Sequence, residues 1–221
     1  MGRWPLVGVF SLIAALASVT AVEATEHALS GISLHGSLVA VYALLRAGLV
    51  ASFTLFVVMR GPALRRSRDP VAFISCAAAI GSLAAFRGPA SSSAPGLVIA
   101  GELIAVVSCG WLLWAALVLG RCFGVLPEAR GLVMSGPYRF VRHPMYLGEL
   151  GACLGLFVAS PGVLNLCLSC VFAIAQGIRM RLEERALTNE FPSYAGYAAR
   201  TARLIPGVGS WRTAREQMEV A

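Results

Sequence analysis

Residues 135–148, with the sequence SGPYRFVRHPMYLG, place a crowded polar cluster directly before an apolar segment. Gly136-Pro137 predicts a turn. Pro144 suits the first position of a helix, because it has no N–H to donate and its φ angle is already helical. His143 then stands at a helix N-terminus, where free N–H groups and the helix dipole favour a negative group. We therefore expect a polar binding site at the entrance of a membrane helix.

The composition indicates an integral membrane protein. Of the 221 residues, 57% are hydrophobic and only 13% are charged, and the mean hydropathy is +0.75. The hydrophobic fraction is higher and the charged fraction lower than in soluble domains, so we expect an all-α, polytopic bundle of five to six transmembrane helices. The formal charge is +7 and every basic residue is Arg. Because these arginines flank apolar runs, they indicate membrane orientation rather than a nucleic-acid partner.

The apolar runs predict where the helices lie. The expected spans are residues 4–22, 36–59, 71–86, 96–120, 145–159 and 163–178. The first run also has the small-x-small pattern of a signal-peptide cleavage site at Val19-Thr20-Ala21, but about 18 apolar residues suffice to span and we favour a transmembrane helix. A polar loop is expected at 23–33. The last two runs flank Ser160-Pro161-Gly162 and predict a tight helical hairpin, whose first arm has a face of small residues from Gly151 to Gly155 for close helix packing.

The loops predict the orientation in the membrane. Arg3, the arginines at 60–68, the 121–142 connection and the tail after Arg179 fall on one side, and Arg87 falls on the other. The positive-inside rule makes the basic side cytoplasmic. We therefore expect a protein of the bacterial inner membrane with both termini in the cytoplasm. Residues 1–120 then form four N-terminal helices, and residues 121–221 form a second region of loop, hairpin and polar tail.

Two features inside the spans carry weaker signals. Arg46 interrupts the second span and is expected either to face the bundle interior with a partner, Glu102 being one candidate, or to snorkel to an interface. Most cysteines lie in apolar runs and resemble buried hydrophobic residues. Cys167 and Cys170 form a lone CxxC pair, which is weak evidence for metal or redox chemistry, so no metal site is predicted.

A second polar cluster follows the hairpin. On a continuing helix, Arg179 and Glu183 lie one turn apart on the same face. Such charge runs usually form a solvated surface. Here, however, the hairpin returns this helix to the membrane face where 142–144 begins, so the two clusters are expected to meet. Aromatic residues at 191–197 are placed to cover such a site.

These motifs resemble a known enzyme family. The segments GPYRFVRHPMYLG, RxxxEExxL, FxxxYxxY and Leu204-Ile205-Pro206-Gly207 are together similar to the isoprenylcysteine carboxyl methyltransferases, whose relatives are the phospholipid N-methyltransferases. The similarity covers residues 120–209. It implies that 121–221 is a methyltransferase-like region with a cytoplasmic tail that helps to bind S-adenosylmethionine.

The resemblance also implies roles for particular residues. The cofactor pocket is expected to include Arg130, Gly131, Leu132, Val133, Tyr138, His143, Pro144, Met145, Tyr146 and Glu183, and charge chemistry adds Arg142 and Glu184. Arg179 is expected to be the catalytic, substrate-side residue. The chain has Arg130-Gly131 where those enzymes often have His-Thr, which departs from the family pattern in that loop.

The chemistry of the cofactor fits these residue types. Carboxylates accept from its ammonium or ribose, Arg and His meet its carboxylate, and Tyr138 or Tyr146 offers an aromatic face to the sulfonium. The sequence therefore predicts a membrane methyltransferase acting on a lipid or prenylcysteine-like carboxylate that enters laterally. Two alternatives stay open. One is an NADPH-dependent reductase of the sterol-reductase type, and the other is a non-catalytic membrane subunit.

Overall fold

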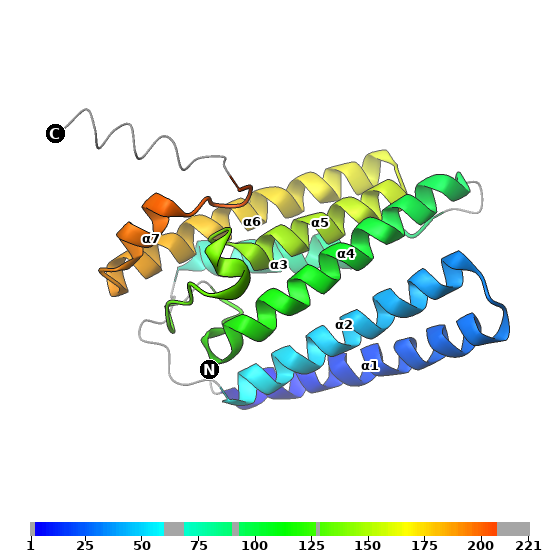
Figure 1. Cartoon of the computed structure of the whole chain (residues 1–221), viewed down its shortest axis with the longest axis horizontal. Coiled ribbons are helices and arrows are strands. Elements are labelled where there is room, and N and C mark those ends of the chain that lie inside the picture. The colour runs from blue at the N-terminus through cyan, green and yellow to red at the C-terminus, as the bar shows by residue number, and fades with distance from the viewer. Residues whose placement is uncertain (1–2, 60–68, 90–92, 127–128, 207–221) are drawn as a thin grey trace.

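The computed structural model describes residues 3–59, 69–89, 93–126 and 129–206. Its elements are α1 (Arg3–Ser30), α2 (Leu34–Met59), α3 (Pro70–Ala84), α4 (Pro95–Leu119), α5 (Pro144–Ala159), α6 (Val163–Glu190) and α7 (Tyr194–Arg200), with short 3-10 helices η1 (Gly120–Cys122) and η2 (Gly136–Arg139). The long helices run roughly side by side, with α7 and the connection between α4 and α5 at one end (Figure 1). The predicted all-α bundle is confirmed.

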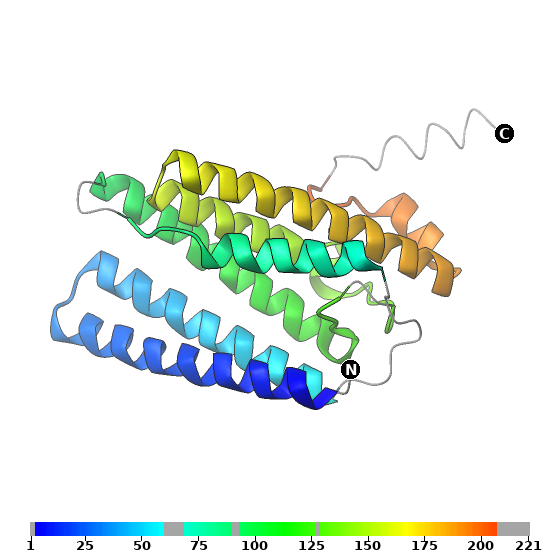
Figure 2. The same cartoon turned by 180° about the vertical axis from the view of Figure 1, so that it is seen from behind.

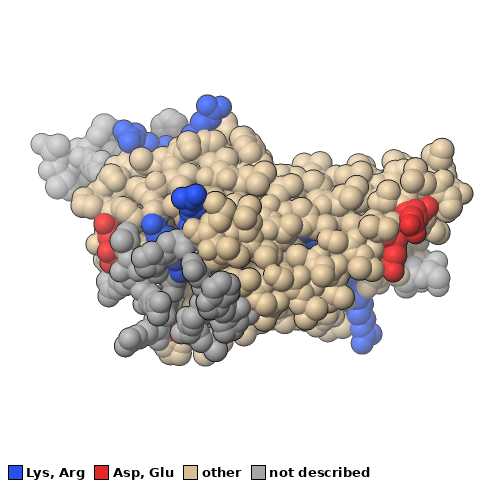
Figure 3. All heavy atoms as spheres, turned by 90° about the horizontal axis from the view of Figure 1, so that it is seen from below, with Lys and Arg blue, Asp and Glu red and all other residues tan. Residues whose placement is uncertain are grey.

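Several helices have the length and composition of membrane spans. Within the described ranges, four helices qualify, namely Val7–Ser30, Leu34–Met59, Pro95–Cys122 and Val163–Glu190, and α3 and α5 are shorter apolar helices. The chain is therefore a multi-pass membrane protein. Blue basic side chains gather toward the end that carries α7, and the middle of the visible face is mostly uncharged (Figure 3).

The first helix is longer than the sequence predicted. A polar loop was expected at 23–33, but α1 continues to Ser30, so this prediction is wrong for residues 23–30. Between Gly8 and Gly31 the chain has no Gly or Pro to interrupt the helix. Glu23 and Glu26 are good helix formers, and the Thr25 hydroxyl donates to the Ala21 carbonyl, 2.7 Å away. Polarity alone therefore does not end this helix.

The bundle has two parts joined through α4. Helices α1 and α2 pack on each other, α2 packs on α4, α4 packs on α5, and α3 packs on α6. Seen from behind, α3 lies along the α5–α6 side of the molecule and apart from the α1–α2 pair (Figure 2). Residues of α1, α2 and α3 line a common cavity with residues of the polar motifs.

Small residues allow α4 and α5 to approach closely, as predicted for the Gly151–Gly155 face. A Cβ atom added to Gly155 would lie 2.6 Å from the Gly101 carbonyl oxygen and 2.7 Å from the Ala105 nitrogen. Both of these contacts are with backbone atoms of α4, which cannot shift without moving the helix. Gly148 is also pressed against Leu112 of α4.

We expect Gly155→Ala to destabilise the protein by about 1–3 kcal/mol through overpacking. The matched control is Gly177→Ala on α6, where an added Cβ meets nothing within 4 Å. That control should be neutral or stabilising, because Ala favours helix by about 1 kcal/mol over Gly. Thermal unfolding in detergent compares the two variants, and equal melting temperatures would contradict the close contact between α4 and α5.

Arg46 does not pair with Glu102, so that candidate pairing is wrong. Arg46 Nη2 donates to the Thr20 hydroxyl of α1 at 2.8 Å. Glu102 instead lies 2.7 Å from His35 Nδ1. The hydrogen bond to Thr20 joins α2 to α1, which pack on each other.

Asn165 fixes the hairpin at the end of the bundle opposite α7. Its Oδ1 accepts from the Arg87 backbone N–H at 3.1 Å, and its Nδ2 donates to the Ser160 carbonyl at 2.7 Å. The side chain is 4% exposed. These contacts join the α5–α6 turn to the segment after α3. The arginines of the 60–68 cluster and Gly207 of the C-terminal motif lie outside the described residues.

Candidate functional site

The predicted turn and helix start are both present. Gly136 adopts a φ of +58°, a left-handed conformation that favours glycine. Pro144 opens α5 and His143 is its N-cap residue. The Trp111 indole N–H of α4 donates to the Pro144 carbonyl at 2.9 Å, which holds the first turn of α5 against α4.

The hairpin brings the two polar clusters together, as the sequence predicted. The Tyr146 hydroxyl donates to Glu183 Oε2 at 2.9 Å. One residue further along α6, Glu184 Oε1 lies 3.1 Å from His143 Nε2. The two carboxylates of the EE pair therefore have different partners, and each joins α6 to the start of α5.

Glu184 binds several basic groups of its own chain. Arg142 Nη1 lies 3.5 Å from Glu184 Oε1, and Arg203 Nε donates to the same oxygen at 3.1 Å. Arg203 Nη2 pairs with the other oxygen, Oε2. Together with His143, these contacts satisfy most of the acceptor capacity of this carboxylate.

The C-terminal segment covers the site. Val141 and Ala202 form a parallel bridge, and the Arg142 and His143 N–H groups donate to Ala202 and Arg203 carbonyls at 2.8 and 3.1 Å. The Tyr197 hydroxyl donates to the Tyr138 carbonyl at 2.6 Å.

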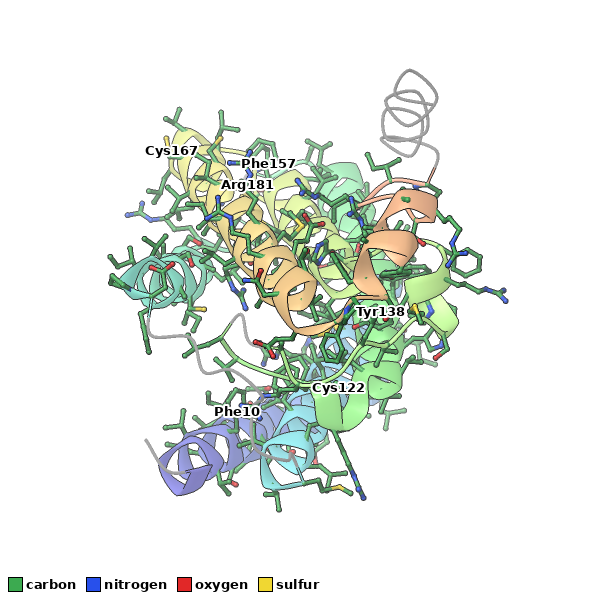
Figure 4. All side chains as sticks on the ribbon, turned by 90° about the vertical axis from the view of Figure 1, so that its left-hand side faces the viewer. Phe10, Cys122, Tyr138, Phe157, Cys167 and Arg181 are labelled. Atoms are coloured by element: carbon green, nitrogen blue, oxygen red, sulfur yellow. The ribbon has the colours of Figure 1, made fainter. Side chains whose placement is uncertain are left out.

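Burial keeps the hydroxyl groups of Tyr138 and Tyr197 neutral. Burial raises the pKa of Tyr138, and burial raises the pKa of Tyr197 to about 12. Both rings therefore keep their protons at neutral pH and present uncharged aromatic surface. Figure 4 shows Tyr138 beside α7 and Phe10 on α1, with the segment that carries Cys122 between them.

A cavity of about 650 Å³ lies beneath this cover, within the range of about 300–1,000 Å³ typical of ligand pockets. Its polar part is lined by Tyr138, Arg142, His143, Tyr146, Glu149, Arg179, Glu183, Tyr194 and Tyr197. Its apolar part includes side chains of α1, α2 and α3, among them Phe10, Ile13, Phe53 and Ile80, and residues of the connection between α4 and α5. The cavity thus joins the polar cluster to the space between the two parts of the bundle.

Most of the predicted site residues line this cavity. They are Gly131, Leu132, Val133, Tyr138, Arg142, His143, Pro144, Met145, Tyr146, Arg179 and Glu183. Arg130 and Glu184 are not among the lining residues. Glu184 borders a separate surface hollow with Arg181, Arg185 and Arg203. In Figure 4, Arg181 lies on α6 away from Tyr138.

The sequence reasoning missed a polar network at the boundary between the two parts of the cavity. Gln176 is 1% exposed, and its amide bridges Glu149 and Arg179, donating to the first and accepting from the second at 2.7 Å. Arg179 Nη1 lies 3.9 Å from Glu149 Oε2, and its guanidinium lies over the Tyr146 ring, 5.2 Å from the centroid. The available signal was an ionisable residue inside an apolar run, which usually marks function.

Among the described residues, three polar atoms of cavity-lining side chains are buried without a hydrogen-bond partner. They are Arg142 Nε, Arg179 Nε and the Tyr194 hydroxyl. Buried polar groups are almost always paired, so a cluster of unpaired ones indicates groups that meet a polar ligand. All three are potential donors, which favours a ligand with acceptor oxygens.

Comparison with known proteins gives two kinds of match. Residues 90–193 match the phospholipid methyltransferase family model. The chain is 35% identical over 102 residues to the cobalt-zinc-cadmium resistance protein CzcN of Cupriavidus metallidurans, covering 45% of this chain and 44% of that protein. It is 31% identical over 103 residues to the nickel-cobalt-cadmium resistance protein NccN of Alcaligenes xylosoxydans xylosoxydans, covering 46% of each. The matched part of the chain thus spans less than half the length of either relative. The family match agrees with the resemblance inferred from the motifs: residues 90–193 are similar to the phospholipid methyltransferases.

Proposed function

We propose that this protein is an S-adenosylmethionine-dependent methyltransferase that acts on a lipid or prenylcysteine-like carboxylate. The observation that carries the proposal is the set of three buried, unpaired donors in a cavity formed by the methyltransferase motifs. The cavity has one polar and one apolar part, as expected for a charged cofactor and a lipid acceptor. The metal-resistance names of the relatives do not identify the acceptor.

The hydrogen-bond donors and acceptors in the polar part of the cavity support binding of S-adenosylmethionine. The unpaired Nε of Arg142 suits the cofactor carboxylate, and Glu183 suits its ammonium or ribose hydroxyls. Tyr138 and Tyr146 supply neutral aromatic surface for a sulfonium. When bound, the cofactor supplies an electrophilic methyl group, and these side chains hold it in line with the acceptor.

The apolar part of the cavity suits a hydrocarbon chain. Phe53 stacks on Phe123 with ring centroids 4.3 Å apart, and Phe10 packs edge-on against Phe53. Ile80 on α3 lines the cavity and is 65% exposed. A chain that enters from the bilayer between α1 and α3 would therefore stay in apolar surroundings up to Arg179.

Titration of the purified, detergent-solubilised protein with S-adenosylmethionine and with NADPH tests the proposal against its alternatives. We expect saturable binding of S-adenosylmethionine only. Binding of NADPH instead would favour a reductase. Binding of neither would favour a non-catalytic subunit.

The proposed orientation places both termini and the cavity mouth in the cytoplasm. In a background without native cysteines, Ala94→Cys before α4 and Asn189→Cys near the end of α6 introduce exposed thiols. A membrane-impermeant maleimide added to intact cells, with the outer membrane permeabilised, should label only Ala94→Cys. Labelling of both positions from the same side would contradict the α5–α6 hairpin and the positive-inside assignment.

A further inference from the structure

Glu149 lines the cavity beside Arg179, the residue proposed to bind the acceptor. It stands on α5 one turn after Tyr146, lines the cavity and is 25% exposed. Its nearest cation is Arg179, with 3.9 Å between Glu149 Oε2 and Arg179 Nη1. This separation exceeds hydrogen-bond distance, so the two groups form a loose ion pair.

Other contacts hold the Arg179 guanidinium without using all of its donors. Nη1 donates to Gln176 Oε1 at 2.7 Å, and Nη2 donates to the Val125 carbonyl at 3.3 Å. Nε is buried and has no partner. The guanidinium is therefore fixed in place by neutral groups and keeps a free N–H for a further acceptor oxygen.

We propose that Glu149 is the resident counter-ion of Arg179, and that the anionic head of the methyl acceptor displaces it. This inference rests on the proposed function, in which Arg179 binds the acceptor. The free Nε–H offers the incoming anion a hydrogen bond that Glu149, at 3.9 Å from Nη1, does not make. The acceptor class that fits is a single negative charge, such as a carboxylate, at the end of a hydrocarbon chain.

The same competition would help the product to leave. In the transfer, a carboxylate oxygen forms a bond to the methyl carbon while the carbon–sulfur bond breaks and its electron pair stays on sulfur. The anion becomes a neutral ester, the sulfonium becomes a neutral thioether, and no proton moves. The ester no longer attracts Arg179, so Glu149 becomes its favoured partner again.

Palmitate, a carboxylate on a single hydrocarbon chain, is the probe for the displacement of Glu149 from Arg179. Removing the competing charge with Glu149→Gln should tighten palmitate binding by about tenfold, equivalent to about 1.4 kcal/mol. Arg179→Gln should weaken palmitate binding by a similar factor or more. Binding of palmitate methyl ester, which has no charge, should change little in either variant. The control is Glu102→Gln, which removes another carboxylate from a membrane helix at a position that does not line the cavity.

The outcomes separate this inference from the proposed function. Unchanged or weaker palmitate binding by Glu149→Gln would overturn the counter-ion role. If Glu149→Gln does not fold, Glu149→Asp withdraws the charge by one methylene and should tighten palmitate binding in the same direction. Each variant is also titrated with S-adenosylmethionine, and its affinity for the cofactor should equal that of the unsubstituted protein. Failure of the parent to bind the cofactor would instead count against the proposed function.

Discussion

Glu183→Gln should lower the affinity for S-adenosylmethionine by about 10- to 100-fold, because a hydrogen bond to a charged group contributes about 1.5–3 kcal/mol. Glu183 lines the polar part of the cavity, and Tyr146 holds one of its oxygens at 2.9 Å. The other oxygen is available to the cofactor ammonium or ribose. Isothermal titration of the detergent-solubilised variant measures the effect.

Glu190→Gln is the matched control for this experiment. Glu190 lies two turns further along α6 and does not line the cavity. Its replacement should leave cofactor affinity unchanged. Unaltered affinity in Glu183→Gln would contradict the site and leave this part of α6 as a solvated, charged helix face.

Arg179→Ala should reduce turnover by about 100-fold while leaving cofactor affinity within a few-fold, because loss of one partner from a buried charged contact costs about 2–5 kcal/mol. The residue stands one turn before Glu183, at the boundary with the apolar part of the cavity. Arg179→Lys should restore little activity, since an ammonium cannot reproduce the planar fork that reaches Gln176 and Val125 together.

Arg181→Ala controls for the loss of positive charge at this end of α6. Arg181 is exposed and borders the separate surface hollow rather than the cavity. Near-parent turnover is expected. A fully active Arg179→Lys enzyme would contradict the acceptor-binding role and leave Arg179 as an anchor at the helix end.

The sequence was informative wherever local rules determine the structure. The Gly136 turn and the Pro144 helix start follow from backbone preferences, and both are observed. The meeting of His143 with the EE pair followed from one tertiary assumption, that the two apolar runs after Met145 form a hairpin. Because that hairpin exists, His143 and Glu184 lie together although they are 41 positions apart in the chain.

The apolar lining of the cavity and the pairings between helices could not be predicted, because they depend on which helices are neighbours. Phe10 and Ile13 line the cavity only because α1 packs on α2 and faces α3 across the cavity, and no local pattern specifies that. The hydrogen bond between Arg46 and Thr20 likewise depends on the packing of α1 on α2. Glu149 carried a usable signal, a lone acid in an apolar run, but its pairing with Arg179 required the register between α5 and α6.

Transfer of label from methyl-labelled S-adenosylmethionine to lipid tests the central claim most directly. Membranes containing the protein are incubated with the labelled cofactor, extracted with organic solvent and treated with mild base, which releases methanol from carboxyl methyl esters. The account predicts base-labile label in the lipid extract, and about 10- to 100-fold less of it at sub-saturating cofactor in membranes that contain Glu183→Gln. Equal label with the parent and with Glu183→Gln, or none with either, would contradict a methyltransferase that acts on a lipid carboxylate.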